Sequence, residues 1–258
     1  MTDLPERLDI AAVAPHPDDL EIICGGTLAR LVKQGYRVGI FDLTSGEPTP
    51  RGSDATRQAE AEAARKILGI PLRVAVGLPN RVLMDAPENR FRIATELRRY
   101  RPKVVITVAG RTPAASPDHH QGHLLAEASR FYSQLTKWDE RFDGTAPWRV
   151  PHLVYAPMPF DAELRHWHST FVVDIGDTIE QKIESVRAYA SQFDPERFDR
   201  VEHMIRSAAG WMGAQAGFTW GEMFALHHPV ATDDLFRLVT GDRPVREVEP
   251  GRGHLPMG

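Results

Sequence analysis

The sequence is poor in cysteine, and Cys24 is the only one among its 258 residues. A single cysteine excludes an intramolecular disulfide and any metal site built from several thiolates. No basic residue lies beside Cys24 in the sequence to activate its thiol. We therefore expect a small buried side chain at this position rather than a nucleophile.

The chain also lacks long hydrophobic runs and an excess of charge of one sign. No segment approaches the roughly 20 apolar residues that a membrane-spanning helix needs. The amino-terminal stretch MTDLPERLDIAAVA does not join a basic start to a long apolar run, which argues against a secretory signal. The net charge is −4 and the pI is near 6.3, so electrostatics gives no attraction to nucleic acid or acidic membranes. We expect a cytoplasmic protein with neither of these partners.

Short apolar runs alternate with amphipathic segments, most regularly in the first half of the chain. Strands are expected over 8–14, 37–43, 72–76, 104–108, 152–156 and 170–174. Helices are expected over 21–34, 54–68, 89–100, 118–134, 177–192 and 197–216, the last interrupted near Gly210. This alternation predicts an α/β fold, a Rossmann-like three-layer sandwich whose sheet is mostly parallel.

The second half is less regular, and we interpret it as a C-terminal extension of the same domain. The domain is expected over residues 1–241, with a core over about 8–175 and a helical extension over about 176–241. Residues 242–258 are rich in proline, glycine and arginine, which predicts a flexible tail.

The first of two informative motifs, Pro15-His16-Pro17-Asp18-Asp19, directly follows a predicted strand. Ligand sites in open α/β sheets gather at the carboxyl ends of strands. A simple helix start would explain Pro17 and one aspartate, but not a histidine where a serine or aspartate cap is usual. His16 and Asp19 are three residues apart, so one turn can direct both at a metal ion. Asp18 is then left to act as a general base toward water that the ion acidifies.

The second motif, Ser116-Pro117-Asp118-His119-His120, follows the strand expected at 104–108 and an irregular loop. It also reads as a helix start, with Ser116 as the cap. Three histidines within five positions, at 119, 120 and 123, favour a metal site, with His119 as its third ligand. Two histidines and a carboxylate suit zinc with an open fourth position, although iron, cobalt or manganese also accept such ligands.

The stretches VAPHPDDLEIICGGTLARL and TSGEPTPRG, with GLPN at 77–80 and RAYASQF further on, resemble the LmbE-like (PIG-L) zinc-dependent N-acetylglucosaminyl deacetylases. Within that family the sequence is most similar to bacillithiol-biosynthesis deacetylases, from about residue 8 to about residue 240. The resemblance implies one Zn2+ ion per chain, bound by His16, Asp19 and His119, with Asp18 as the general base. It also implies a homo-oligomer such as a hexamer.

The sequence departs from the family where the second motif normally begins with a catalytic histidine, because Ser116 stands there. A serine hydroxyl donates one hydrogen bond but carries no charge, so it stabilises an oxyanion less well. We list Ser116 and His120 with Asp18 as catalytic residues, since His120 is the nearest histidine that can fill the gap. His227 and His228 are the alternatives for that role.

A loop expected after the second strand holds two candidate substrate-binding residues. Arg51 matches the family's Arg-Gly, and Glu47 ends a Thr44-Ser45-Gly46-Glu47 stretch where the family has Thr-Arg-Gly-Glu. The resemblance implies that both contact a sugar. The other interpretation is a solvent-exposed loop without such a role.

Together these features predict a hydrolase that removes an acetyl group from an N-acetylglucosamine-type substrate. N-acetylglucosaminyl malate, used in low-molecular-weight thiol biosynthesis, is one such substrate. The alternatives are a metal-dependent amidase or deacetylase acting on another sugar or secondary metabolite, and a sugar-binding homologue with weakened catalysis. A dinucleotide-binding domain is disfavoured, because Gly25-Gly26 lacks the G-x-G-x-x-G spacing.

Overall fold

The computed structural model describes residues 7–112, 115–158, 169–233 and 235. Contacts within the chain divide it into Met1–His227 and His228–Gly258, and the architecture below is that of the first unit. The tail predicted over 242–258 lies outside the described residues. No helix in the described ranges is both long and apolar enough to cross a bilayer.

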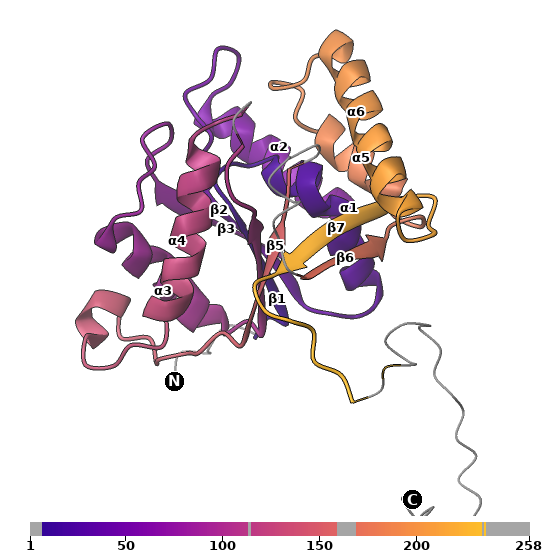
Figure 1. The fold of residues 1–258 in the computed structure, drawn as a ribbon. Helices are drawn as coiled ribbons and strands as arrows, with labels where there is room; N and C mark the ends of the chain where they lie inside the picture. The colour runs from indigo at the N-terminus through magenta and orange to yellow at the C-terminus, as the bar shows by residue number, and fades with distance from the viewer. Residues whose placement is uncertain (1–6, 113–114, 159–168, 234, 236–258) are drawn as a thin grey trace, which may run out of the picture. The chain divides into compact units, whose positions relative to one another are not determined.

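The first unit alternates strands and helices as the sequence predicts (Figure 1). The strands are β1 (Ile10–Ala14), β2 (Val38–Thr44), β3 (Leu72–Leu78), β4 (Val104–Val108), β5 (His152–Ala156), β6 (Ser169–Asp174) and β7 (Gly221–Leu226). The helices are α1 (Asp19–Lys33), α2 (Asp54–Leu68), α3 (Pro87–Tyr100), α4 (Asp118–Tyr132), α5 (Ile179–Arg187) and α6 (Pro195–Ala214), with a short 3-10 helix at Asp139–Phe142.

The strands form one sheet in the order β3-β2-β1-β4-β5-β7-β6. The pairs β3–β2, β2–β1, β1–β4 and β4–β5 are parallel, and β7 pairs antiparallel with both β5 and β6. This arrangement confirms the predicted Rossmann-like fold with a mostly parallel sheet. The order reverses between β1 and β4, which makes that pair the topological switch point.

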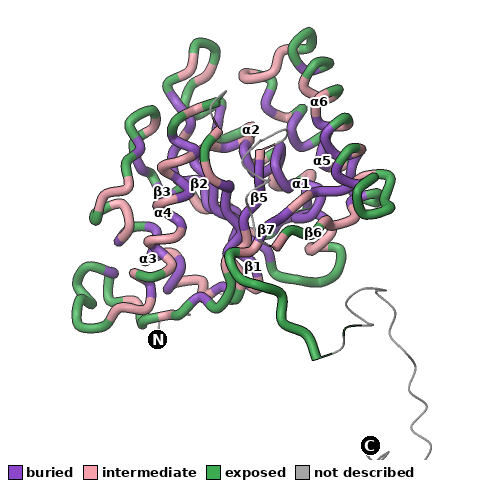
Figure 2. Tube along the Cα trace, viewed as in Figure 1, coloured by how far each residue is buried: buried purple, intermediate pink, exposed green. Residues whose placement is uncertain are grey.

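Alternate residues of β1 pack into two separate hydrophobic cores, as expected for a strand buried on both faces. Ile10, Ala12 and Ala14 pack with α1, whereas Ala11 and Val13 pack with residues of α3 and α4. Helices α1, α2, α5 and α6 lie on one side of the sheet, and α3 and α4 lie on the other (Figure 1). Strands β1 and β2 at the centre of the sheet are buried throughout, whereas β3 and β6 are only partly buried (Figure 2).

Helix α1 is broken at Cys24, whose backbone is non-helical at φ −142° and ψ 19°. The N–H groups of Gly26 and Thr27 donate to the carboxylate of Glu222 at 3.1 and 2.7 Å. Lys182 Nζ lies 2.5 Å from the same carboxylate. This buried ion pair ties β7 and α5 to the break in α1. Cys24 is buried as predicted, and burial raises the pKa of its thiol well above the ordinary value.

The second half departs from the sequence-based prediction in three places. Strand β7 was not expected, the helix predicted over 177–192 ends at Arg187, and α6 continues without interruption through Gly210. A Cβ at Gly210 would make only an ordinary van der Waals contact with the Trp220 ring, at 3.4 Å, and the glycine does not break the helix. After Arg187 the chain bends so that the Tyr189 hydroxyl donates to the buried Glu21 carboxylate at 2.9 Å.

We expect Glu222→Ala to lower the free energy of unfolding by about 3–5 kcal/mol, because it leaves the buried Lys182 ammonium unpaired. Urea unfolding followed by circular dichroism measures this change. Glu180→Ala is the matched control, since its ion pair with Arg206 is on the surface and is worth about 0–1 kcal/mol. Equal effects of the two substitutions would contradict the structural role of the buried pair.

Candidate active site

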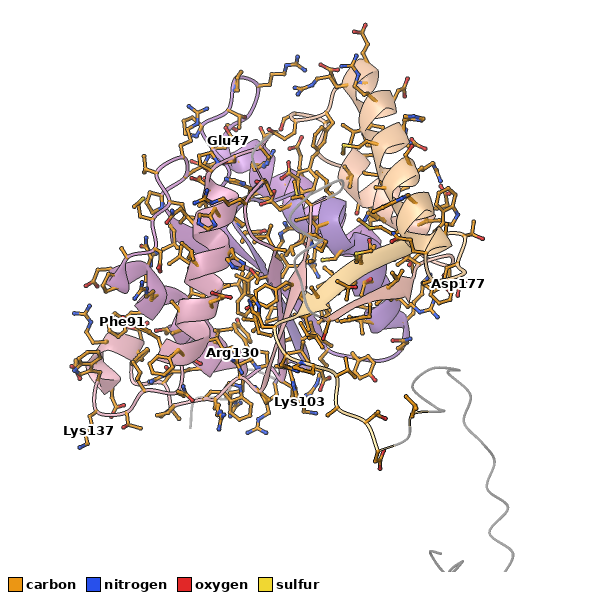
Figure 3. All side chains as sticks on the ribbon, in the orientation of Figure 1. Glu47, Phe91, Lys103, Arg130, Lys137 and Asp177 are labelled. Carbon is orange, nitrogen blue, oxygen red and sulfur yellow. The ribbon has the colours of Figure 1, made fainter. Side chains whose placement is uncertain are left out.

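The two motifs meet because they follow the two strands at the switch point. Strands β1 and β4 pair in parallel, with Val13 opposite Thr107, so both end at the same edge of the sheet. Figure 3 shows Glu47, which follows β2, near one end of the molecule and Lys103, which precedes β4, near the other. Residues that follow the parallel strands therefore gather at the end that holds Glu47.

His16, Asp19 and His119 are brought together at this edge. One ligand atom from each lies within 4.8 Å of the others, the only such group of three or more found in the part of the chain that the structure describes. His119 Nε2 is 3.1 Å from Asp19 Oδ1, and His16 Nδ1 is 3.3 Å from Asp19 Oδ2. Ligand atoms of a tetrahedral zinc, each about 2.0–2.1 Å from the metal, lie roughly 3.3 Å apart. The donor types suit zinc, and the two separations, which run to different oxygens of Asp19, are close to this spacing.

The charges of these residues support one another. Burial acts to raise the pKa of Asp19, but the His119 and His16 imidazoles hold it below its usual range. Burial acts to lower the pKa of His16, but the Asp19 carboxylate outweighs it and raises the pKa to about 9. The carboxylate is thus kept ionised, the form in which it binds metal.

Asp118 lies against the second ring nitrogen of His16, a role that the sequence did not reveal. Its carboxylate lies 3.4 Å from His16 Nε2 and accepts the backbone N–H of Arg81 at 2.8 Å. A carboxylate on the second ring nitrogen fixes the orientation of a ligating histidine and raises its basicity. Asp118 is nearly fully buried, so water weakens this contact little.

The Asp18 carboxylate is directed toward Arg57 on α2 and not toward the Asp19 carboxylate. Its backbone adopts φ 110°, a conformation that residues other than glycine rarely adopt. Arg57 Nη2 donates to Asp18 Oδ2 at 3.0 Å and to the Pro17 carbonyl at 2.6 Å. Burial raises the pKa of Asp18 to about 7, although Arg57 acts in the opposite direction. A carboxylate in this position can take up and release a proton near neutral pH.

Arg57 is a site residue that the sequence analysis missed. Its side chain is only 4% exposed, and its guanidinium lies over the Tyr189 ring at 5.3 Å. Nε and Nη1 are buried without a hydrogen-bond partner among the described residues. The only available signal was an arginine on the inward face of an otherwise polar helix.

Ser116 lies just before α4 but is not its cap, because the N-cap of α4 is Pro117 and no side chain caps the helix. Ser116 Oγ accepts the backbone N–H of Asp118 at 3.2 Å, and this leaves the hydroxyl proton free to donate elsewhere. His120 is half-buried, and its Nδ1 has no partner within the described ranges. Its ring lies 6.3 Å from that of His123, whose Nδ1 is 3.1 Å from the carbonyl of Val108 at the end of β4.

The structure does not bring His227 to the three metal-ligand candidates. Its Nε2 lies 3.1 Å from Glu127 Oε1. Glu127 follows His119 by eight residues on α4, which is about 12 Å along a helix. His227 directly follows the last residue of β7. Its contact with Glu127 does not support it as a replacement for the family histidine that is absent at position 116. His228 belongs to the second unit.

The two substrate-binding candidates have partners within the protein. Glu47 is buried, and its carboxylate accepts the N–H of Thr49 at 2.5 Å and the Thr49 hydroxyl at 2.8 Å. These contacts fold the loop between β2 and α2. Arg51 forms an ion pair with Asp194, the N-cap of α6, and its side chain is 52% exposed. Its guanidinium is therefore accessible to solvent near the loop.

Comparison with known proteins agrees with this arrangement. The family described as GlcNAc-PI de-N-acetylase (PIG-L) matches residues 11–129. The diacetylchitobiose deacetylase of Thermococcus kodakarensis is 30% identical over 223 residues, which cover 83% of this chain and 80% of the relative. The crystal structure of the conserved protein TT1542 from Thermus thermophilus has 35% identity and a TM-score of 0.74, covering 87% of this chain and 97% of that one. The inhibitor complex of the N,N'-diacetylchitobiose deacetylase from Pyrococcus horikoshii has 25% identity and a TM-score of 0.74, with coverages of 90% and 89%.

We expect the purified chain to bind about one zinc ion, and alanine at His16, Asp19 or His119 to reduce this to a small fraction of an ion. Equilibrium dialysis followed by elemental analysis measures the stoichiometry. His152→Ala makes the same chemical change at an exposed position on β5 and should retain the ion. Stoichiometric zinc in the His119→Ala variant would contradict the site.

Proposed function

The chain belongs to the PIG-L (LmbE-like) family of deacetylases, and from this premise we propose that it hydrolyses the acetamide of an N-acetylglucosamine-type substrate. The observation that carries the proposal is the convergence of His16, Asp19 and His119 beside the separate carboxylate of Asp18. A purely metal-binding site needs the first three residues only. A hydrolase also needs a base that is not a ligand.

His16, Asp19 and His119 would hold a zinc ion, which when bound supplies a Lewis acid that polarises the amide carbonyl and acidifies water. Asp18 takes a proton from the water that attacks the carbonyl carbon, and Arg57 holds its carboxylate in place. As the carbon–nitrogen bond breaks, Asp18 returns a proton to the leaving nitrogen. The second proton of the water leaves as the acetic acid ionises and is taken up by the amine. The products are therefore acetate and the protonated amine of a glucosamine-type sugar, so atoms and charge balance.

We assign oxyanion stabilisation on the protein side to His120 and Ser116. The hydroxyl proton of Ser116 is free to donate because only its oxygen is engaged, by the backbone N–H of Asp118. His120 adds a buried ring nitrogen without a partner among the residues described. The serine hydroxyl lacks the charge that a protonated histidine at position 116 would place there, so we expect a modest contribution from it.

Position 116 also favours a second candidate substrate class. A changed residue beside the reacting carbonyl alters which amide the site accommodates, so an acetamide outside the N-acetylglucosamine series is the alternative. The loop between β2 and α2 adds to this argument, since Ser45 stands where the family has arginine.

We expect acetate release from at least one of N-acetylglucosaminyl malate, diacetylchitobiose and N-acetylglucosamine, and we propose the malate conjugate as the preferred of the three. Asp18→Asn should lower kcat by about 10²–10⁴-fold and leave bound zinc unchanged, because it removes the base but no ligand. Asp177→Asn, whose side chain is 86% exposed, is the matched control.

Each result of this experiment has a definite meaning. Full activity in Asp18→Asn would refute the role of the base. Release from a non-sugar acetamide alone would favour the second substrate class. Stoichiometric zinc without release from any substrate would favour a binding protein.

We expect His120→Ala to lower kcat by about 10-fold or more, toward the 10²–10³-fold loss seen when a full oxyanion donor is removed. His227→Ala should leave kcat unchanged, because its ring pairs with Glu127 away from the proposed site. Steady-state kinetics at saturating substrate compares the two. Equal rates in wild type and His120→Ala would show that His120 does not compensate for the histidine that is absent at position 116.

A further inference from the structure

We propose that Thr112 is a positioning residue for the metal centre, and that its hydroxyl fixes the His119 imidazole with Nε2 directed at Asp19. This inference rests on the metal site proposed above. Thr112 Oγ1 lies 2.8 Å from His119 Nδ1, and His119 Nε2 lies 3.1 Å from Asp19 Oδ1. Both ring nitrogens are therefore engaged, and a flip of the ring would break both contacts.

The loop before α4 holds Thr112 in place on either side. The carbonyl of Thr112 accepts the N–H of Ala115 at 2.9 Å. Two residues before Thr112, the N–H of Gly110 lies 3.3 Å from Nδ1 of His123. Because His123 follows His119 by one helical turn, the loop is fastened to the same helix that carries the ligand. The threonine side chain is also β-branched and has few rotamers, so its hydroxyl has little freedom to leave the ring.

The chemistry of the contact suits a ligating histidine. Such a residue nearly always donates its second N–H to a carboxylate, a carbonyl or water, which fixes its tautomer. With Nε2 facing the metal site, Nδ1 carries the proton and the Thr112 oxygen accepts it. His119 itself is buried, with 4% of its surface exposed, so water competes little for this nitrogen.

The two histidines of the site are therefore supported differently. Asp118, a carboxylate, faces the second nitrogen of His16, whereas a neutral hydroxyl faces that of His119. A carboxylate raises the basicity of its histidine more than a hydroxyl does. We assign to Thr112 the orientation of His119 rather than a strong increase in its basicity.

Two substitutions separate the hydroxyl from the rest of the side chain. Thr112→Val keeps the shape and removes the hydroxyl, while Thr112→Ser keeps the hydroxyl and removes a methyl group. We expect Thr112→Val to weaken zinc binding about 10- to 100-fold, measured by competition with a chromophoric chelator. Thr112→Ser should retain wild-type affinity. With Co2+ as a spectroscopic probe, the visible absorption should change in the valine variant and not in the serine variant.

Thr107→Val is the matched control. Thr107 is a fully buried threonine on β4, and its hydroxyl has no partner among the described residues, so the same change should leave zinc affinity unaltered. Thermal unfolding of chelator-treated protein checks that each variant folds. Thr112→Ala replaces the valine variant if that one does not fold.

Wild-type affinity in Thr112→Val would overturn the inference and leave the metal site standing. An equal loss in the valine and serine variants would also overturn it, because the loss would then follow packing rather than the hydroxyl. Failure of the wild-type chain to bind zinc would overturn both the metal site and this inference. Zinc binding by the wild-type chain therefore distinguishes a failure of the Thr112 inference alone from a failure of the metal site.

Discussion

The parallel pairing of β1 with β4 is the constraint on which the site depends. His16 and His119 are about a hundred positions apart in sequence; His16 comes two residues after β1, and His119 lies at the start of α4, after the loop that follows β4. In a parallel pair both strands end at the same edge, and at a switch point no further strand lies between them. The same pairing in an antiparallel sense would place the motifs at opposite ends of the sheet. The metal-ligand group therefore follows from strand order before any side chain is considered.

A network of buried polar side chains connects the strands of the sheet to Asp18, the proposed base. Arg73 on β3 joins the carboxylates of Asp42 and Glu21, at 2.5 and 2.6 Å. Glu21 on α1 accepts the Tyr189 hydroxyl, and the ring of Tyr189 lies beneath Arg57. Each buried charge in this chain of contacts has an opposite partner, as burial requires. Residues of β2, β3 and α1 thus help to hold the Arg57 guanidinium, which orients Asp18.

Much of the architecture was predictable because it depends on short-range patterns. The helix at 54–68 and the strands at 104–108 and 152–156 have the predicted bounds, since caps and apolar runs mark them locally. The grouping of His16, Asp19 and His119 was also predictable, because two adjacent strand ends explain it. Strand β7 was not, because it returns antiparallel from the C-terminal part and its pairing partners are distant in sequence.

The supporting residues were unpredictable for a related reason. Asp118 and Thr112 act through contacts with ring nitrogens of His16 and His119, and nothing in their own neighbourhood distinguishes them from a helix-start acid and a loop threonine. Arg57 reaches Asp18 from a different helix. Such roles depend on side-chain direction, which spacing along the chain does not encode when the partners lie on separate elements.

The conformation of Asp18 bears on whether the site catalyses or merely binds. A residue other than glycine at φ 110° costs about 1–3 kcal/mol, and such strain persists only where the surroundings impose it. Here the strain places a carboxylate beside the ligand group without joining it, and a buried arginine holds it there. A protein that only bound metal or sugar would lose nothing if this residue relaxed or were replaced by glycine. The strained, arginine-held carboxylate is therefore a stronger argument for hydrolysis than the ligand group itself, and it is unaffected by the serine at position 116.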